Sequence, residues 1–164
     1  GIGSYSHLSG VWFNDAAKVR TNLVPYNSTS PYNDLLAGQV QLMFDGLPAA
    51  AGPIRGGKLK LLAITGKERH PSFPTVPTFA EAGLPDYAPI AWQGILAPAG
   101  TPQPILDKLS NAMKQACQSQ ELGKKWREYG GELRCNTPAE FNAFINADRA
   151  MWGKVIRQAN VKLD

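Results

Sequence analysis

The sequence predicts an α/β fold with a mostly parallel sheet in its first half and helices through its last third. Short apolar runs alternate with segments of helical period up to about residue 65, and repeated strand–helix–strand units imply parallel pairing with right-handed crossovers. Hydrophobic residues make up 43% and charged residues 18% of the 164 residues, a globular composition rather than a disordered one. A mixed α+β sheet is the alternative interpretation of the same pattern.

The first half contains strong helix signals. Ser30 is expected as an N-cap with Pro31 in the first helical position, and Gly38 ends that helix. The expected elements of this half are a helix at 6–19, a strand at 22–25, a helix at 31–37, a strand at 39–44, a helix at 47–55 and a buried strand at 58–65.

The second half carries similar signals. Thr78 with Glu81 and Thr137 with Glu140 have the spacing of capping boxes, and Thr101 is the expected cap of a helix that begins at Pro102. The expected elements are a short helix at 78–82, a strand at 90–96, helices at 102–116, 121–129 and 138–158, and a candidate strand at 132–135.

The net charge of +4 and the pI of about 9.1 do not by themselves indicate nucleic-acid binding. The densest basic run, at 124–127, is followed directly by Glu128, as on a solvated helix face. No apolar stretch reaches the roughly 18 residues of a membrane span, and no signal peptide is recognisable. With no starting Met, we expect a processed, truncated or expressed fragment.

The two cysteines, Cys117 and Cys135, are too far apart for a CxxC redox motif and have no histidine at zinc-site spacing. Two interpretations stay open: one disulfide formed in an oxidising compartment, or two buried free thiols.

The strongest candidate binding site is the glycine-rich start of the chain, just before the first helix. Glycines let backbone amides approach a ligand, the first helical N–H groups have no intrahelical partner, and the helix dipole favours an anion. The simpler interpretation is capping by Ser6 after a flexible terminus. The residues predicted to bind a carboxylate or phosphate here are Gly1, Ile2, Gly3, Ser4, Ser6 and His7.

Two further candidates follow predicted strands, where ligands sit in open α/β sheets. Tyr26, Asn27 and Ser28 lie between a strand and a helix, although the same residue types suit a plain turn. Asp45 offers a hydrogen-bond acceptor, but its spacing favours an N-cap of the next helix.

Catalytic chemistry finds little support. A Ser–His–Asp set can be assembled from Ser4 or Ser6, His7 and Asp45, but no nucleophile elbow, Walker A loop, EF-hand or zinc spacing occurs. We therefore expect no catalytic residues, no metal and no cofactor.

A series of short motifs runs in order along nearly the whole chain. Residues 1–8 have the pattern G-x-G-S/T-x-x-H-L, and residues 24–26 read VPY. The further segments are DLLAGQV at 34–40, LMFD-x-x-P at 42–48, GKL-x-x-LA at 57–63, VPT at 76–78, EAG at 81–83, W-x-G at 92–94 and APAGTP at 97–102. In order and spacing these motifs resemble those of the solute-binding proteins of the tripartite tricarboxylate transporter (Bug) family.

This resemblance implies a type II periplasmic binding fold of two α/β lobes around a cleft, of which this chain is the C-terminal half. Residues 1–90 are then most of the second lobe. Residues 91–164 are a crossover strand and C-terminal helices that pack toward the first lobe, or pair with a second copy as a homodimer. The family's VPYRG-like loop reads VPYNS here, a departure that bears on ligand preference near Asn27.

The function implied by the resemblance is capture of a small carboxylate in the periplasm for membrane transporter subunits, without catalysis and without nucleic acid. The implied role of the first loop is that of one of two pincers holding the carboxylate through backbone amides and waters. A solute-sensing or interaction module with no transport role is the alternative, and an orphan enzyme is a third.

Overall fold

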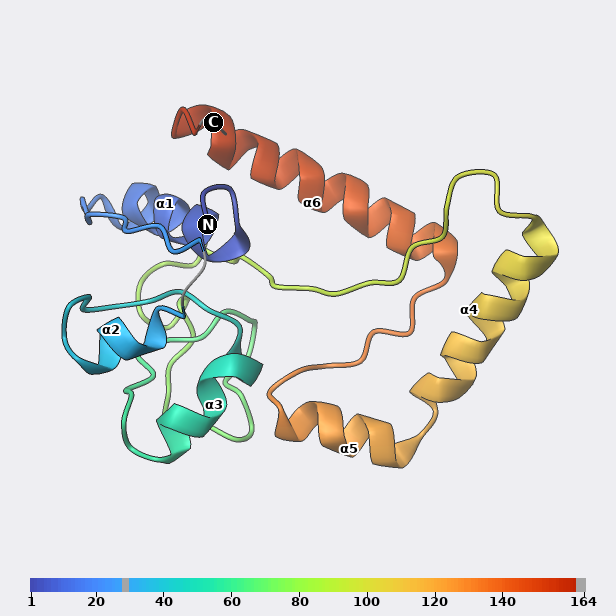
Figure 1. The fold of residues 1–164 in the computed structure, drawn as a ribbon, viewed down its shortest axis with the longest axis horizontal. Helices are drawn as coiled ribbons and strands as arrows, with labels where there is room; N and C mark the ends of the chain where they lie inside the picture. Colours follow the sequence, from blue (N-terminus) through green and yellow to red (C-terminus); the bar gives the residue numbers. More distant parts are fainter. Residues whose placement is uncertain (28–29, 162–164) are drawn as a thin grey trace.

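Six helices joined by long loops make up the computed structural model, which describes residues 1–27 and 30–161. In Figure 1, α1 and α6 lie beside each other, α2 and α3 lie below α1, and a long loop leads across to α4 and α5. The helices are α1 (Tyr5–Ala17), α2 (Tyr32–Leu36), α3 (Leu47–Arg55), α4 (Gln103–Cys117), α5 (Gln120–Glu128) and α6 (Pro138–Gln158).

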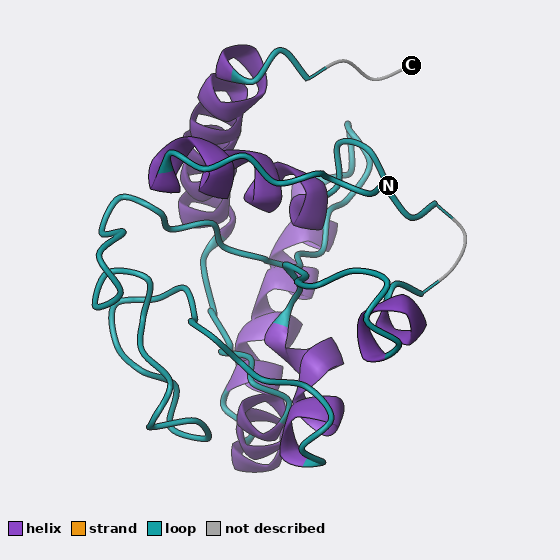
Figure 2. Cartoon of the chain, turned by 90° about the vertical axis from the view of Figure 1, so that its left-hand side faces the viewer, coloured by secondary structure: helices purple, strands orange, loops and turns teal. Residues whose placement is uncertain are grey.

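The described residues contain no β-strand, so the predicted mostly parallel sheet is not confirmed (Figure 2). One isolated parallel bridge joins Ile64 to Thr78. A strand is stable only when a neighbour accepts and donates its ladder hydrogen bonds. Here the segments with strand composition find no such neighbour and run as loops. Residues 58–65 are not buried either, since Leu62 exposes 64% of its surface.

The helices agree more closely with the sequence because their end signals are local. Helix α3 has the predicted bounds, and α6 begins with the predicted capping box of Thr137 and Glu140. Helix α1 begins one residue before the prediction, and Ser4, not Ser6, is its N-cap.

Two other predicted caps are wrong in detail. Pro31 is the N-cap of α2, although the Ser30 hydroxyl still accepts a hydrogen bond from the Tyr32 N–H at 3.4 Å. Pro102 is the N-cap of α4, because the Thr101 hydroxyl donates to the Pro98 carbonyl at 2.8 Å instead.

The capping box predicted at residues 78–82 forms without a helix. The Thr78 N–H donates to Glu81 Oε2 at 2.8 Å, and the Glu81 N–H donates to the Thr78 hydroxyl at 3.1 Å. Gly83, with a φ of +92°, then turns the chain away after a few turn residues. The hydrogen bonds of the motif thus stabilise a turn rather than start a helix.

An aromatic core centred on Tyr87 fixes α1 in place. Tyr87 is 2% exposed, and its ring lies 5.5 Å from that of Trp12 and 5.8 Å from that of Phe13. Trp12 also contacts Trp152 of α6 edge to face at 5.7 Å. Such pairs add about 0.5–1.5 kcal/mol each beyond their buried area. The core therefore orients the start of α1, where the first candidate site lies.

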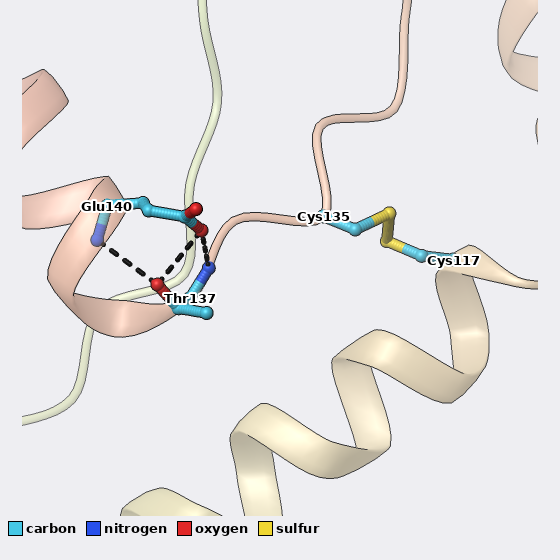
Figure 3. Close-up of a disulfide and its surroundings, with 4 residues drawn as sticks. All are labelled: Cys117, Cys135, Thr137 and Glu140. Atoms are coloured by element: carbon cyan, nitrogen blue, oxygen red, sulfur yellow. Dashed lines mark hydrogen bonds between the residues drawn. A yellow bond between two sulfur atoms is a disulfide. The ribbon is translucent and has the colours of Figure 1, made fainter.

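A disulfide between Cys117 and Cys135 decides between the two interpretations that the sequence left open (Figure 3). It joins the end of α4 to the segment before α6, with 6.0 Å between the Cα atoms. The closed loop contains all of α5. Among residues 1–27 and 30–161, no helix is both long enough and apolar enough to cross a bilayer.

Candidate functional site

The first candidate site is a tight turn that leads into α1. The Ser4 N–H donates to the Gly1 carbonyl at 3.1 Å, and Gly3 has a φ of +78°, in the left-handed region that favours glycine. The Ser4 hydroxyl accepts a hydrogen bond from the His7 N–H at 3.3 Å, which caps the helix. Glycine and serine at these positions therefore define the shape of the turn.

Not every amide of this turn is free to meet a ligand. The Gly3 N–H donates to His7 Nδ1 at 3.2 Å, and the His7 N–H is taken by Ser4. The N–H groups of Tyr5 and Ser6 have no partner within the described part of the chain. These two amides lie at the positive end of the helix dipole, where they are donors available to an anion.

The second candidate segment lies directly beside the first. A Cβ atom added to Gly1 would lie 2.9 Å from Asn27 Oδ1 and 4.0 Å from the Tyr26 carbonyl oxygen. The Tyr26 hydroxyl donates to Asp34 Oδ2 at 2.7 Å, and this hydrogen bond raises the pKa of Tyr26. Tyr26 therefore keeps only an acceptor for other groups. Ser28 lies outside the described residues.

Asp45 is an exposed acceptor and not the N-cap that its spacing favoured. Gly46 is the N-cap of α3, with no side-chain capping bond. The Asp45 carboxylate accepts hydrogen bonds from the Tyr32 hydroxyl and from the Gly46 N–H, both at 2.8 Å. Burial, followed by these interactions with Asp45, raises the pKa of Tyr32. Asp45 thus brings a fixed negative charge to this region rather than a donor.

Tyr5 connects Asp45 with the start of α1. Burial raises the pKa of the Tyr5 hydroxyl, the neighbouring Ser9 side chain partly opposes this rise, and the negative charge of Asp45 adds to it. The structure therefore places the first loop beside Asn27, whereas Asp45 is linked to the loop only through the effect of its charge on the Tyr5 hydroxyl.

The sequence interpretation overlooked four residues of this region: Tyr5, Ser9, Tyr32 and Thr65. Two signals would have identified three of them. Tyr5 and Ser9 are four residues apart on one helix face, and Thr65 ends the apolar run at 58–65, as Asp45 follows that at 39–44. Tyr32 has no such signal.

Two surface hollows lie elsewhere. One of about 540 Å³ lies at the junction of α4 and α5, around Ser119 and Lys124. The other, of about 340 Å³, lies between α1 and α6 and is lined by Val11 and Val155, among others. Neither is lined by a residue that the sequence predicted to bind ligand.

The contacts within the candidate site do not include a nucleophile–base pair among the described residues. Ser4 and His7 are joined through the backbone N–H of His7, not through the imidazole. Asp45 bonds to Tyr32 and to its own neighbour. No group of three His, Cys, Asp or Glu side chains in the described ranges is placed to hold a metal ion.

Comparisons with known proteins point to one family. Residues 1–161 match the model of the family described as "Tripartite tricarboxylate transporter family receptor". The protein BugT of Bordetella pertussis is 32% identical over 163 residues, which are 99% of this chain and 50% of BugT.

Two solved structures from Rhodopseudomonas palustris superpose closely on the chain. Rpa4515 with adipate is 34% identical, with a TM-score of 0.88 over 97% of this chain and 54% of its own. MatC with bound malate is also 34% identical, with a TM-score of 0.83 over 94% of this chain and 54% of its own. The chain thus spans about half the length of these relatives, whose periplasmic binding fold is α/β.

Proposed function

The chain belongs to the tripartite tricarboxylate transporter receptor family, and on this premise we propose that it captures a small carboxylate for an uptake system and catalyses no reaction. The observation that carries the proposal is the pair of free amides, of Tyr5 and Ser6, at the positive end of α1 beside Asn27. Two carboxylate oxygens are suitable acceptors for two neighbouring backbone N–H groups at a helix start.

The ligand class comes from the relatives. Rpa4515 was solved with adipate and MatC with malate, both dicarboxylates with a short carbon chain. The charge of Asp45 supports a ligand that meets Asp45 through a hydroxyl group or through a bridging water. A second carboxylate in direct contact would be repelled. Ser6 and His7 add side-chain donors in this proposal, and Asn27 an amide.

The proposed arrangement has two lobes that close on the ligand. Residues 1–90 form most of one lobe, and residues 91–164 pack toward the other. The large exposed apolar side chains beyond residue 90 support this division, since Ile95 and Leu96 expose 70% and 72% of their surface. The polypeptide equivalent to the unmatched half of the relatives would cover them, or a second copy of this chain would.

The proposed location is outside the cytoplasm, with membrane transporter subunits as partners. The disulfide of Cys117 and Cys135 supports this, because structural disulfides persist in oxidising compartments such as the periplasm.

Isothermal titration with adipate and with malate tests the proposal. The Gly3→Val variant forces a branched side chain into a φ of +78° and should abolish saturable binding. Gly57→Val is the matched control: Gly57 has a φ of +69° with open space around it at the end of α3, so its backbone cost is similar while the loop stays intact. Equal binding by the Gly3→Val variant, or no binding by the wild-type chain, would contradict the proposal.

A further inference from the structure

The Ser9 hydroxyl is a buried polar group without a partner. Ser9 is 1% exposed, and its Oγ atom makes no hydrogen bond to any described residue. A hydroxyl buried without a hydrogen bond costs about 1–3 kcal/mol. Native proteins leave few such groups, so each one calls for an explanation such as a bound water, an ion or a functional role.

The neighbours of Ser9 are polar and belong to the candidate site. The Tyr87 hydroxyl donates to the Ser9 carbonyl at 3.0 Å, which fixes this turn of α1 against the core. Tyr5, one helical turn earlier, has only a long hydrogen bond from its hydroxyl to the Pro89 carbonyl, at 3.4 Å. Both Tyr5 and Ser9 thus keep hydrogen-bonding capacity that the chain does not use.

Two further side chains influence the Tyr5 hydroxyl. Ser9 follows Tyr5 by four residues on the same face of α1. The Ser9 and Thr65 side chains both act to lower the pKa of Tyr5, against the stronger effect of its burial. The Ser9 hydroxyl itself makes no hydrogen bond to Tyr5. Tyr5 also supplies one of the two free amides at the start of α1. One residue therefore joins the amide site to the buried hydroxyls behind it.

We infer that Ser9, Tyr5 and Thr65 form a hydroxyl-lined subsite behind the start of α1 that hydrogen-bonds an oxygen of the bound carboxylate, directly or through one ordered water. This inference rests on the proposed function. A hydroxyl can donate to a carboxylate oxygen and also accept from a water, so a set of hydroxyls suits either arrangement. The Ser9 Oγ atom is then satisfied only when the ligand is bound.

This role makes a prediction that a structural serine would not share. If Ser9 were bonded within the helix, its removal would cost stability. If it awaits a ligand oxygen, Ser9→Ala removes an unpaired buried group, so the ligand-free chain keeps or gains thermal stability while binding weakens.

The experiment compares the wild-type chain, Ser9→Ala and the control Ser110→Ala, a serine in α4 distant from the loop in sequence and space. Melting temperatures are measured without ligand, and adipate affinity by titration calorimetry. The expected result is an unchanged or higher melting temperature for Ser9→Ala with an affinity about 3- to 10-fold weaker, the loss of one hydrogen bond. Ser110→Ala should bind as the wild type does.

A lower melting temperature with unchanged affinity in Ser9→Ala would overturn the inference. Should the wild-type chain bind neither adipate nor malate, the proposed function fails, and a crystal structure of the same chain decides on the subsite alone. An ordered oxygen on Ser9 Oγ would then support the subsite, and a hydroxyl bonded only within the chain would overturn it. With adipate bound, the same crystals distinguish a ligand oxygen from a bridging water.

Discussion

The backbone N–H of Gly3 donates a hydrogen bond to Nδ1 of His7, with 3.2 Å between the two nitrogen atoms. Because Nδ1 accepts this bond, a neutral His7 carries its proton on Nε2. The bond closes the turn around Ser4 and accompanies the left-handed conformation of Gly3. His7 therefore positions the loop from within the first turn of α1.

Replacing His7 by phenylalanine should loosen this turn. Phenylalanine keeps a planar ring but offers no acceptor, so the Gly3 amide loses its partner. We expect hydrogen exchange at Gly3 to become roughly 2- to 10-fold faster, the equivalent of one hydrogen bond. Exchange measured by NMR on ¹⁵N-labelled protein checks this.

The matched variant is His7→Asn, whose Oδ1 atom can take the place of Nδ1 as acceptor. Its Gly3 amide should stay protected. Protection that is the same in the Phe and Asn variants would show that the Gly3–His7 bond does not hold the loop.

Tyr87 should be the most sensitive position of the aromatic core. Its ring centroid lies 4.5 Å from that of Phe79, and its hydroxyl donates to the Ser9 carbonyl at 3.0 Å. Tyr87→Phe removes only the hydrogen bond and should cost about 1 kcal/mol, whereas Tyr87→Ala also leaves a cavity and should cost roughly 3–5 kcal/mol. Urea denaturation gives both values, and similar losses for the two variants would contradict the assigned packing.

The helices were largely predictable because the signals that begin and end them lie within a few residues. Thr137, Pro138 and Glu140 specify the start of α6 without reference to anything distant. The strands were not predictable in this way. Apolar runs such as 58–65 and 90–96 form strands only when another segment pairs with them, and pairing is not encoded within the run itself.

The same contrast between local and long-range signals explains which parts of the candidate site could be predicted. The glycines and Ser4 at the first turn are recognisable from local spacing, and the structure places them there. Asp45 was given a capping role by its position alone, but Tyr32, thirteen residues earlier, supplies its hydrogen bond instead. The free hydroxyl of Ser9 depends on how Tyr5 and Tyr87 pack around it, and no pattern in the sequence reports that.

The capping box of α6 should make stability depend on pH. Hydrogen bonds from the Thr137 N–H and hydroxyl lower the pKa of Glu140 below its usual value of 4.5. A lowered folded-state pKa means that this stabilisation is present above the unfolded-state pKa and is lost as the pH falls through the folded-state pKa. Urea denaturation at about pH 7 and about pH 3 should show the loss.

Two variants separate the pH effect of Glu140 from the effects of other acidic groups. Glu140→Gln should flatten the part of the pH dependence that Glu140 contributes, while leaving that of Glu81, whose pKa Arg69 lowers, in place. Thr137→Ala should cost about 1 kcal/mol at neutral pH through loss of the N-cap. A pH dependence identical in wild type and Glu140→Gln would show that the box is not formed in solution.

Reducing the disulfide should destabilise the chain, because Cys117 and Cys135 close a loop with a sequence separation of 18 that contains α5. A loop of this size corresponds to roughly 3 kcal/mol in the chain-entropy treatment. Urea denaturation with and without a phosphine reductant measures the difference. The double variant Cys117→Ser, Cys135→Ser should be as unstable as the reduced wild type and insensitive to reductant. A reductant effect that persists in this variant would mean that the loss does not come from the bond.

Gly94 should not tolerate a side chain, because residues 92–94 lie close against α6. A Cβ atom on Gly94 would overlap the ring of Phe141, and the neighbouring Trp92 ring meets Phe141 edge to face at 5.5 Å. The Trp92 indole N–H also donates to Asp148 Oδ2 at 3.0 Å, so the segment cannot move away without losing that bond. Gly94→Ala should therefore cost about 1–3 kcal/mol through overpacking.

A compensating change on α6 tests the cause directly. Phe141→Leu shortens the side chain that the new methyl group would meet, so the double variant Gly94→Ala, Phe141→Leu should be more stable than the sum of the single losses predicts. The coupling energy from this cycle should be about 1 kcal/mol or more, because the two side chains are in contact. Losses that simply add would mean that residue 94 does not touch Phe141.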